Sequence, residues 1–168
     1  MGGPKGKNAE NVILSGLARL EYRGYDSAGI AVFSESTGVD QFKSLGQVQL
    51  LTDLVNGSKS PKKNYQSGIG HTRWATHGRV TIENTHPHTD AHKEYFVVHN
   101  GIIENHVQLR SELHDQEFYG DTDTEVVVKL LSETPGDTLL ERVTKLIPRL
   151  HGSFALLIMS TQNVNEMI

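Results

Sequence analysis

The feature that most constrains the fold is the stretch 68–101, which is bounded by two short apolar strands that both end in polar residues and glycine. The first predicted strand, 69–72, is followed by Arg-Trp-Ala-Thr-His-Gly, and the second, 95–99, is followed by Asn-Gly. Apolar runs this short, with glycine and polar residues at their ends, indicate strands of a sheet. We therefore expect a sheet whose strand ends bring polar groups together.

Asn100 and Gly101 follow the second of these strands and could supply two hydrogen-bond donors. Asn100 carries a side-chain NH2 group, and Gly101 has a backbone N–H that no side chain shields. Two such donors can stabilise an oxyanion, a contribution of roughly 3 to 4 kcal/mol per donor where deletion has been measured. The alternative is structural, because Asn-Gly is also the strongest short signal for a hairpin turn.

The end of the first strand suggests a site for an anion. Arg73 and Trp74 end it together, and Thr76 and His77 follow at once. A permanently charged guanidinium beside hydroxyl and imidazole donors suits a carboxylate. The alternative is a solvated loop whose aromatic ring packs onto the surface.

The remaining pattern predicts helices that alternate with strands. A helix capped by Asn8 carries one apolar stripe of Val12, Ile13, Leu17 and Leu20, with a glycine at position 16 that should allow close packing. Further helices are predicted at 47–55, 105–114, 121–131 and 138–150, and further strands at 28–33, 39–42 and 154–159. The hairpin over 28–42 favours an antiparallel sheet, so the fold class is layered α+β.

The start of the predicted helix at 121–131 is acidic, with Asp121, Asp123 and Glu125 in the sequence Asp-Thr-Asp-Thr-Glu. Negative charge there is favoured by the helix dipole. Simple N-capping by Asp121 or Asp123 is the structural alternative to a role in binding.

Composition limits the function classes. The 168 residues are 36% hydrophobic and 21% charged with a net charge of −4, which predicts one ordinary globular domain without a nucleic-acid or anionic-membrane partner. No apolar run approaches the ~20 residues of a membrane helix, and the start lacks the apolar core of a secretion signal, so we expect a cytoplasmic location. Cysteine is absent, which excludes disulfides, thiolate metal sites and a cysteine nucleophile within this sequence.

Four motifs resemble the glutaminase domain, a class II glutamine amidotransferase domain, of the glutamine–fructose-6-phosphate aminotransferases. They are LEYRGYDSAG at 20–29, GHTRWATHG at 70–78, HNGIIENH at 99–106 and TDTEV at 122–126, in the order of that family. The resemblance implies an N-terminal-nucleophile hydrolase fold, an αββα sandwich that is incomplete here because its first and C-terminal strands are missing. Residues 8–168 would be a partial amidotransferase domain, after a leader or cloning remnant at 1–7.

The resemblance also implies how glutamine would be bound. Arg73 would pair with the α-carboxylate of glutamine, helped by Thr76 and His77, while Asp123 would bind the α-ammonium group. Trp74 would belong to a loop that covers the site and gates ammonia. No cofactor and no metal is implied.

Catalytic roles are implied for Asn100 and Gly101, as the oxyanion hole, and for Arg23, as support for the nucleophile. In that family the nucleophile is an N-terminal cysteine whose own α-amino group acts as general base. This sequence begins Met-Gly-Gly-Pro and has no cysteine, so we expect it to be inactive as a glutaminase by itself. The parent enzyme would be a homodimer through sugar-phosphate isomerase domains that this sequence lacks.

Two other function classes stay open. A metal-dependent hydrolase is suggested by His86, His88 and His92, although no helical HExxH pair accompanies them. A non-catalytic glutamine-binding or regulatory module is suggested by the missing cysteine together with the retained Arg73 and Asp123.

Overall fold

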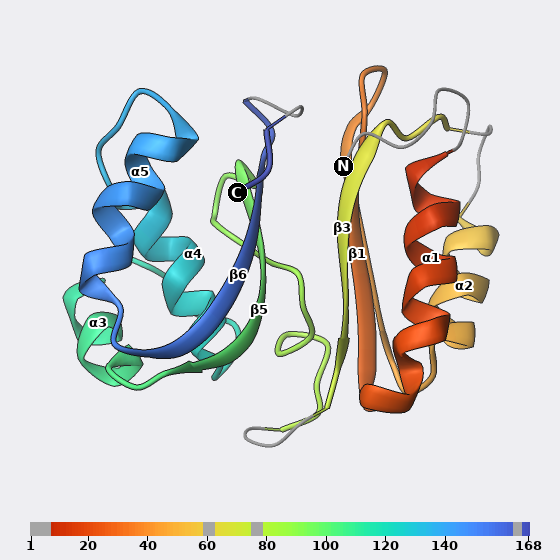
Figure 1. Cartoon of the computed structure of the whole chain (residues 1–168), viewed down its shortest axis with the longest axis horizontal. Coiled ribbons are helices and arrows are strands. Elements are labelled where there is room, and N and C mark those ends of the chain that lie inside the picture. The colour runs from red at the N-terminus through yellow and green to blue at the C-terminus, as the bar shows by residue number, and fades with distance from the viewer. Residues whose placement is uncertain (1–7, 59–62, 75–78, 163–165) are drawn as a thin grey trace. The chain divides into compact units, whose positions relative to one another are not determined.

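The computed structural model describes residues 8–58, 63–74, 79–162 and 166–168. The chain divides into two compact units, Met1–Pro87 and His88–Ile168. Each unit is an antiparallel three-stranded sheet with helices packed on it (Figure 1). The predicted α+β class is therefore confirmed, and the strands form two sheets, as the αββα resemblance implied, and not the single sheet that the strand pattern alone suggested. The predicted leader at 1–7 lies outside the described residues.

The first unit is a β-hairpin extended by one further strand. Its elements are α1 (Ala9–Leu20), the 3-10 helix η1 (Glu21–Arg23), β1 (Ser27–Ser34), β2 (Gly38–Leu45), α2 (Val48–Gly57) and β3 (Ser67–Arg73). The strand order is β2-β1-β3, and both pairings are antiparallel. Helices α1 and α2 lie on one face of this sheet (Figure 1).

Helix α1 begins as predicted, because the Asn8 side chain accepts a hydrogen bond from the backbone N–H of Glu10. Its buried stripe differs from the prediction, since Leu14 is buried with Leu17 while Val12 is 49% exposed. The glycine that allows close packing between α1 and the sheet lies on β3 and not on the helix. A Cβ atom at Gly70 of β3 would lie 2.5 Å from Ile13 Cγ2, whereas one at residue 16 would meet open space.

The second unit places three helices on a second sheet. Its elements are β4 (His88–Thr89), β5 (Tyr95–Ile103), α3 (His106–Glu112), α4 (Asp123–Glu133), α5 (Leu139–Leu146), the 3-10 helix η2 (Ile147–Arg149) and β6 (Gly152–Ser160). The strand order is β4-β5-β6, and both pairings are antiparallel. The side chains of α4 from Thr124 to Leu131 are all buried, so this helix forms the centre of the core.

Strand β5 is longer than the predicted 95–99, because it pairs with β6 without interruption from Tyr95↔Ser160 to Ile103↔Gly152.

Among the described residues, no helix is long and apolar enough to cross a membrane.

Candidate active site

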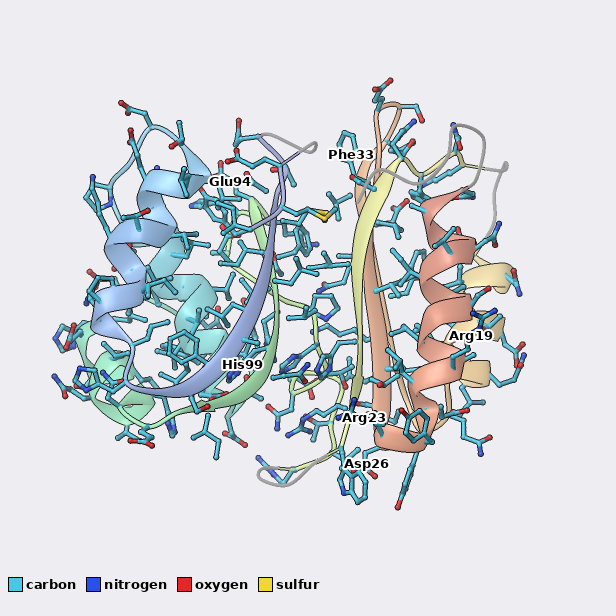
Figure 2. All side chains as sticks on the ribbon, viewed as in Figure 1. Arg19, Arg23, Asp26, Phe33, Glu94 and His99 are labelled. Carbon is cyan, nitrogen blue, oxygen red and sulfur yellow. The ribbon has the colours of Figure 1, made fainter. Side chains whose placement is uncertain are left out.

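The turn after α1 in the first unit brings Arg23 beside the end of β3. A Cβ atom at Gly24 would lie 2.9 Å from the carbonyl carbon of Arg73, so only glycine allows this approach of two backbones. The Asp26 N–H donates to the Arg73 carbonyl at 3.1 Å. Figure 2 shows Arg23 and Asp26 at the same end of the unit. The first unit therefore gathers Arg23, Arg73 and Trp74, three of the predicted site residues.

The Arg73 guanidinium is held by the segment 79–87. Its Nη1 donates to the Arg79 carbonyl at 3.2 Å, and the Asn84 side-chain amide donates to the same carbonyl at 3.0 Å. Arg73 is only 8% exposed, so this contact limits the orientations that the charged group can adopt. Asn84 was not predicted as a site residue, and its sequence context gives no signal for this role.

The segment 79–87 is itself anchored on the sheet of the first unit. The His86 carbonyl sits against Gly29 of β1 so closely that a Cβ atom there would overlap it, and the Gln41 side chain donates to the Pro87 carbonyl at 2.7 Å. The His86 ring stacks on the His71 ring at 4.5 Å between centroids. His86, which the sequence suggested only as a possible metal ligand, thus has structural contacts that help to fix the segment holding Arg73.

The other residues predicted near Arg73 are only partly described. Trp74 is 57% exposed, and its ring lies 5.9 Å from the ring of Tyr25. Thr76 and His77 lie outside the described residues, so their predicted contacts with a carboxylate stay predictions.

In the second unit, Asn100 and Gly101 lie inside β5, where they pair with Ala155 and Phe154. The alternative of a hairpin turn at Asn-Gly is therefore wrong. Gly101 has a φ of +132°, and a Cβ atom there would overlap the carbonyl oxygen of Ser153. Position 101 requires glycine for both reasons.

The backbone N–H of Gly101 is directed to the edge of β5 that faces away from β6. On that edge the Tyr95 N–H donates to Asp90 and the Ile103 N–H donates to Asp123. Successive N–H groups of a strand alternate between its two edges, so Gly101, two residues before Ile103, shares this direction. Among the described strands, β4 covers this edge only beside Phe96 and Val97. The geometry therefore suits Gly101 as an oxyanion donor.

Asp123 is the first residue of α4 and lies beside this edge. The cap of the helix is Thr122, whose hydroxyl accepts the Glu125 N–H at 3.2 Å, so the interpretation of Asp123 as a simple N-cap is wrong. Asp123 Oδ2 accepts the Ile103 N–H at 2.9 Å, while its Oδ1 lies 3.3 Å from Thr124 Oγ1 and 3.6 Å from His99 Nδ1.

These contacts decide the charge of Asp123. Burial raises its pKa, but the neighbouring His99 side chain and the hydrogen bond from the Ile103 N–H outweigh burial and lower the pKa from 3.8 to about 2. Because the pKa is lowered, the carboxylate is charged at neutral pH. Its side chain is 21% exposed, so a ligand can reach it. His99 was not predicted; the one signal in the sequence is its position directly before Asn100.

The second unit thus brings Asn100, Gly101 and Asp123 to one end of β5, and the first unit brings Arg73 to the end of β3. The assignment of both sets to one ligand stays a prediction. The metal alternative gains no support: His88 Nε2 lies 3.0 Å from Thr122 Oγ1, the His92 N–H donates to Asp90, and no group of three or more possible ligands occurs in the described parts of the chain.

Comparisons with known proteins identify a family and relatives that match this chain. Residues 71–168 match the family described as a glutamine amidotransferase domain. The glutamine–fructose-6-phosphate aminotransferase (isomerizing) of Aquifex aeolicus is 43% identical over 94% of this chain, and that of Bacillus subtilis is 45% identical over 93%. The chain spans 26% of the length of each of these relatives.

Two solved structures are similar to this chain in fold. The glutamine phosphoribosylpyrophosphate amidotransferase of B. subtilis, complexed with ADP and GMP, matches 92% of this chain and 33% of its own, with a TM-score of 0.76 and 26% identity. A structure described as the allosteric regulatory enzyme of purine biosynthesis matches 92% of this chain and 34% of its own, with a TM-score of 0.77 and 28% identity. These similarities confirm the predicted N-terminal-nucleophile fold class.

Proposed function

Because this chain belongs to the glutamine amidotransferase domain family, we propose that it is the glutamine-binding part of an enzyme that releases ammonia from glutamine for a second substrate. The relatives at 43 and 45% identity are named glutamine–fructose-6-phosphate aminotransferases, which makes fructose 6-phosphate the proposed acceptor in the complete enzyme. In the same proposal, the acceptor site and dimerisation of the complete enzyme would belong to sugar-phosphate isomerase domains, in the part of the relatives' length that this chain does not match. A cytoplasmic location is part of the same proposal.

The observation that carries the proposal is the Asp123 carboxylate beside the Gly101 segment of β5. A charged, partly exposed carboxylate held by the Ile103 N–H suits the α-ammonium group of an amino acid. Asn100 and Gly101 precede Ile103 on the same strand and would bind the other end of the ligand.

Arg73 binds the α-carboxylate in this proposal. A guanidinium offers donors in a fixed plane that matches both oxygens of a carboxylate. The Arg79 carbonyl accepts one donor of Arg73 and so fixes that plane before a ligand arrives. Thr76 and His77 would add hydrogen bonds to the same carboxylate.

The residues of this chain orient the glutamine and stabilise the charge that develops on it. A thiolate attacks the side-chain amide carbon, and the carbonyl oxygen that becomes negative accepts hydrogen bonds from the Asn100 amide and the Gly101 N–H. Because the 168 residues contain no cysteine, the thiolate has to come from outside this sequence. Arg23 would support that nucleophile, and the exposed Trp74 would help to cover the bound glutamine.

Calorimetric titration of the 168-residue chain with L-glutamine tests the proposal. We expect saturable binding of L-glutamine and none of D-glutamine. Arg73→Gln and Asp123→Asn should each raise Kd about tenfold to hundredfold, because a hydrogen bond to a charged group contributes roughly 1.5 to 3 kcal/mol.

Matched controls separate these losses from a general effect of charge. Arg19→Gln removes a cation from the exposed last turn of α1, and Asp121→Asn removes an exposed acid two residues before Asp123. Both should bind like the parent chain. A folded chain that gives no heat with L-glutamine, or an Asp123→Asn chain that binds as tightly as its parent, would contradict the proposal. A glutamate-release assay should show no turnover above buffer, as the lack of cysteine predicts.

A further inference from the structure

We propose that His99 and Thr124 are positioning residues that fix the Asp123 carboxylate through a directed hydrogen-bond relay. The relay consists of three residues: His99 Nδ1 lies 3.0 Å from Thr124 Oγ1, and Thr124 Oγ1 donates to Asp123 Oδ1 at 3.3 Å. The inference deepens the proposed function and rests on it, because Asp123 is there the group that binds the α-ammonium of glutamine.

The direction of the relay follows from a count of hydrogens. An ionised carboxylate can only accept hydrogen bonds, and a threonine hydroxyl has one hydrogen to donate. Because Thr124 gives this hydrogen to Asp123, it has to accept from His99, so His99 carries a hydrogen on Nδ1. The same Nδ1–H lies 3.6 Å from Asp123 Oδ1 and adds a favourable dipole beside the carboxylate.

His99 occupies a position on β5 where an apolar residue would be expected. The side chains of Tyr95, Val97 and Ile103, at even spacings along β5, belong to the hydrophobic core beneath the helices. His99 follows the same alternation, contacts α4, and is only 5% exposed. A polar ring in such a place costs stability unless it is hydrogen-bonded, so its contact with Thr124 has to offset that cost.

The relay and the Ile103 N–H hold the two oxygens of Asp123 from two different elements. Oδ2 accepts the Ile103 N–H of β5, and Oδ1 accepts the Thr124 hydroxyl of α4. A carboxylate has about four positions for accepting hydrogen bonds, so this arrangement fixes its plane and still leaves acceptor capacity for an ammonium group. Loss of the relay should therefore weaken glutamine binding without any change in a residue that touches glutamine.

The first test concerns the relay itself and needs no ligand. Nitrogen-15 NMR of the histidine rings should identify the Nδ1–H tautomer at His99. In a carboxyl carbon-13 titration, His99→Leu and Thr124→Val should raise the pKa of Asp123 by about one unit. His99→Asn places an amide NH2 near the position of Nδ1, and Thr124→Ser keeps the hydroxyl, so both should keep the parent value to within a few tenths of a unit.

The second test measures L-glutamine binding by calorimetry in the same four variants. His99→Leu and Thr124→Val should raise Kd about five- to tenfold, while His99→Asn and Thr124→Ser should stay within about twofold of the parent chain. Circular dichroism of each variant establishes that it is folded. If His99→Leu does not fold, the comparison of the isosteric Thr124→Val with the hydroxyl-retaining Thr124→Ser decides the question. A simple packing role would lower the stability of every variant and leave the Asp123 pKa unchanged.

Two results would overturn the relay: an Nε2–H tautomer at His99, or an Asp123 pKa and a glutamine Kd that do not differ between Thr124→Val and Thr124→Ser. A parent chain that shows the predicted tautomer and titration but binds no L-glutamine would instead refute the proposed function and, with it, the role of the relay in binding.

Discussion

Replacing Asp123 with asparagine should remove part of the pH dependence of unfolding in the second unit. The native carboxylate has a pKa lowered from 3.8 to about 2, because His99 and the Ile103 N–H favour its charged form more than burial opposes it. A group with a lowered native pKa stabilises the fold above its unfolded pKa, and this stabilisation disappears as the pH falls toward the native pKa. The affected window is therefore about pH 4 down to pH 2.

The size of this effect follows from the pKa difference. A shift from 3.8 to about 2 is about 1.8 units, and each unit corresponds to about 1.36 kcal/mol, which gives about 2.4 kcal/mol as an upper value. The side chain is 21% exposed, so solvent screens part of the interaction. We expect about 1 kcal/mol of stability at pH 6 that is absent near pH 2.

Urea unfolding at pH 6, pH 4 and pH 2.5 measures this contribution, with the methyl NMR signals of the buried Val126, Val127 and Val128 as reporters for the second unit. The difference in unfolding free energy between the parent chain and Asp123→Asn should shrink by about 1 kcal/mol from pH 6 to pH 2.5. Asp121→Asn serves as the control for the loss of one negative charge. Parallel pH profiles for the parent chain and Asp123→Asn would refute the reasoning, because they would mean that folding leaves the pKa of this carboxyl unchanged.

Three further predictions concern other positions. Gly101→Ala should destabilise the second unit by roughly 2 kcal/mol or more in urea unfolding, because its φ of +132° is strained for alanine and the added Cβ would overlap a carbonyl oxygen of β6. Asn84→Ala should raise the Kd for L-glutamine severalfold in calorimetry with unchanged circular dichroism, because it removes a donor from the carbonyl that also holds Arg73. Tyr65→Phe should cost about 1 to 2 kcal/mol of stability, because the Tyr65 hydroxyl donates to Asp40 at 2.6 Å, and ultraviolet titration should show that burial raises the pKa of this phenol above its usual value of 10.

Local signals in the sequence were enough to predict most elements. Asn8 caps α1 as expected, and the strand pattern at 28–33 and 39–42 forms the hairpin of β1 and β2. Such features depend on residues close together in the chain, so periodicity and capping rules describe them well. The division of the strands into two sheets depends on pairing between distant segments, for which local patterns carry no information.

The Asn-Gly pair shows how pairing overrides a local signal. Asn100 and Gly101 match the preference of a tight turn, yet nine consecutive residues of β5 pair with β6 and carry the strand through them. Within the site, the sequence pointed to Asp123 as an acidic residue at a helix start but could not distinguish a cap from a ligand-binding group. The distinction depends on the Ile103 N–H, which lies 20 positions earlier in the chain. The contact between His99 and Thr124 joins residues 25 positions apart, so local sequence patterns could not predict it either.

Two glycines of the motifs, Gly24 and Gly29, help to position charged residues by allowing two backbone segments to approach closely. Gly24 allows the turn that carries Arg23 to lie against the backbone of Arg73, and Gly29 allows the His86 carbonyl to lie against β1. The second contact anchors the segment 79–87, whose Arg79 carbonyl holds the guanidinium of Arg73. A methyl group at either glycine would therefore displace backbone and, through it, the cation proposed to bind glutamine. Both positions need space for a neighbouring backbone segment. Substitution of either glycine by serine or alanine should therefore impair glutamine binding, even in a variant that still folds.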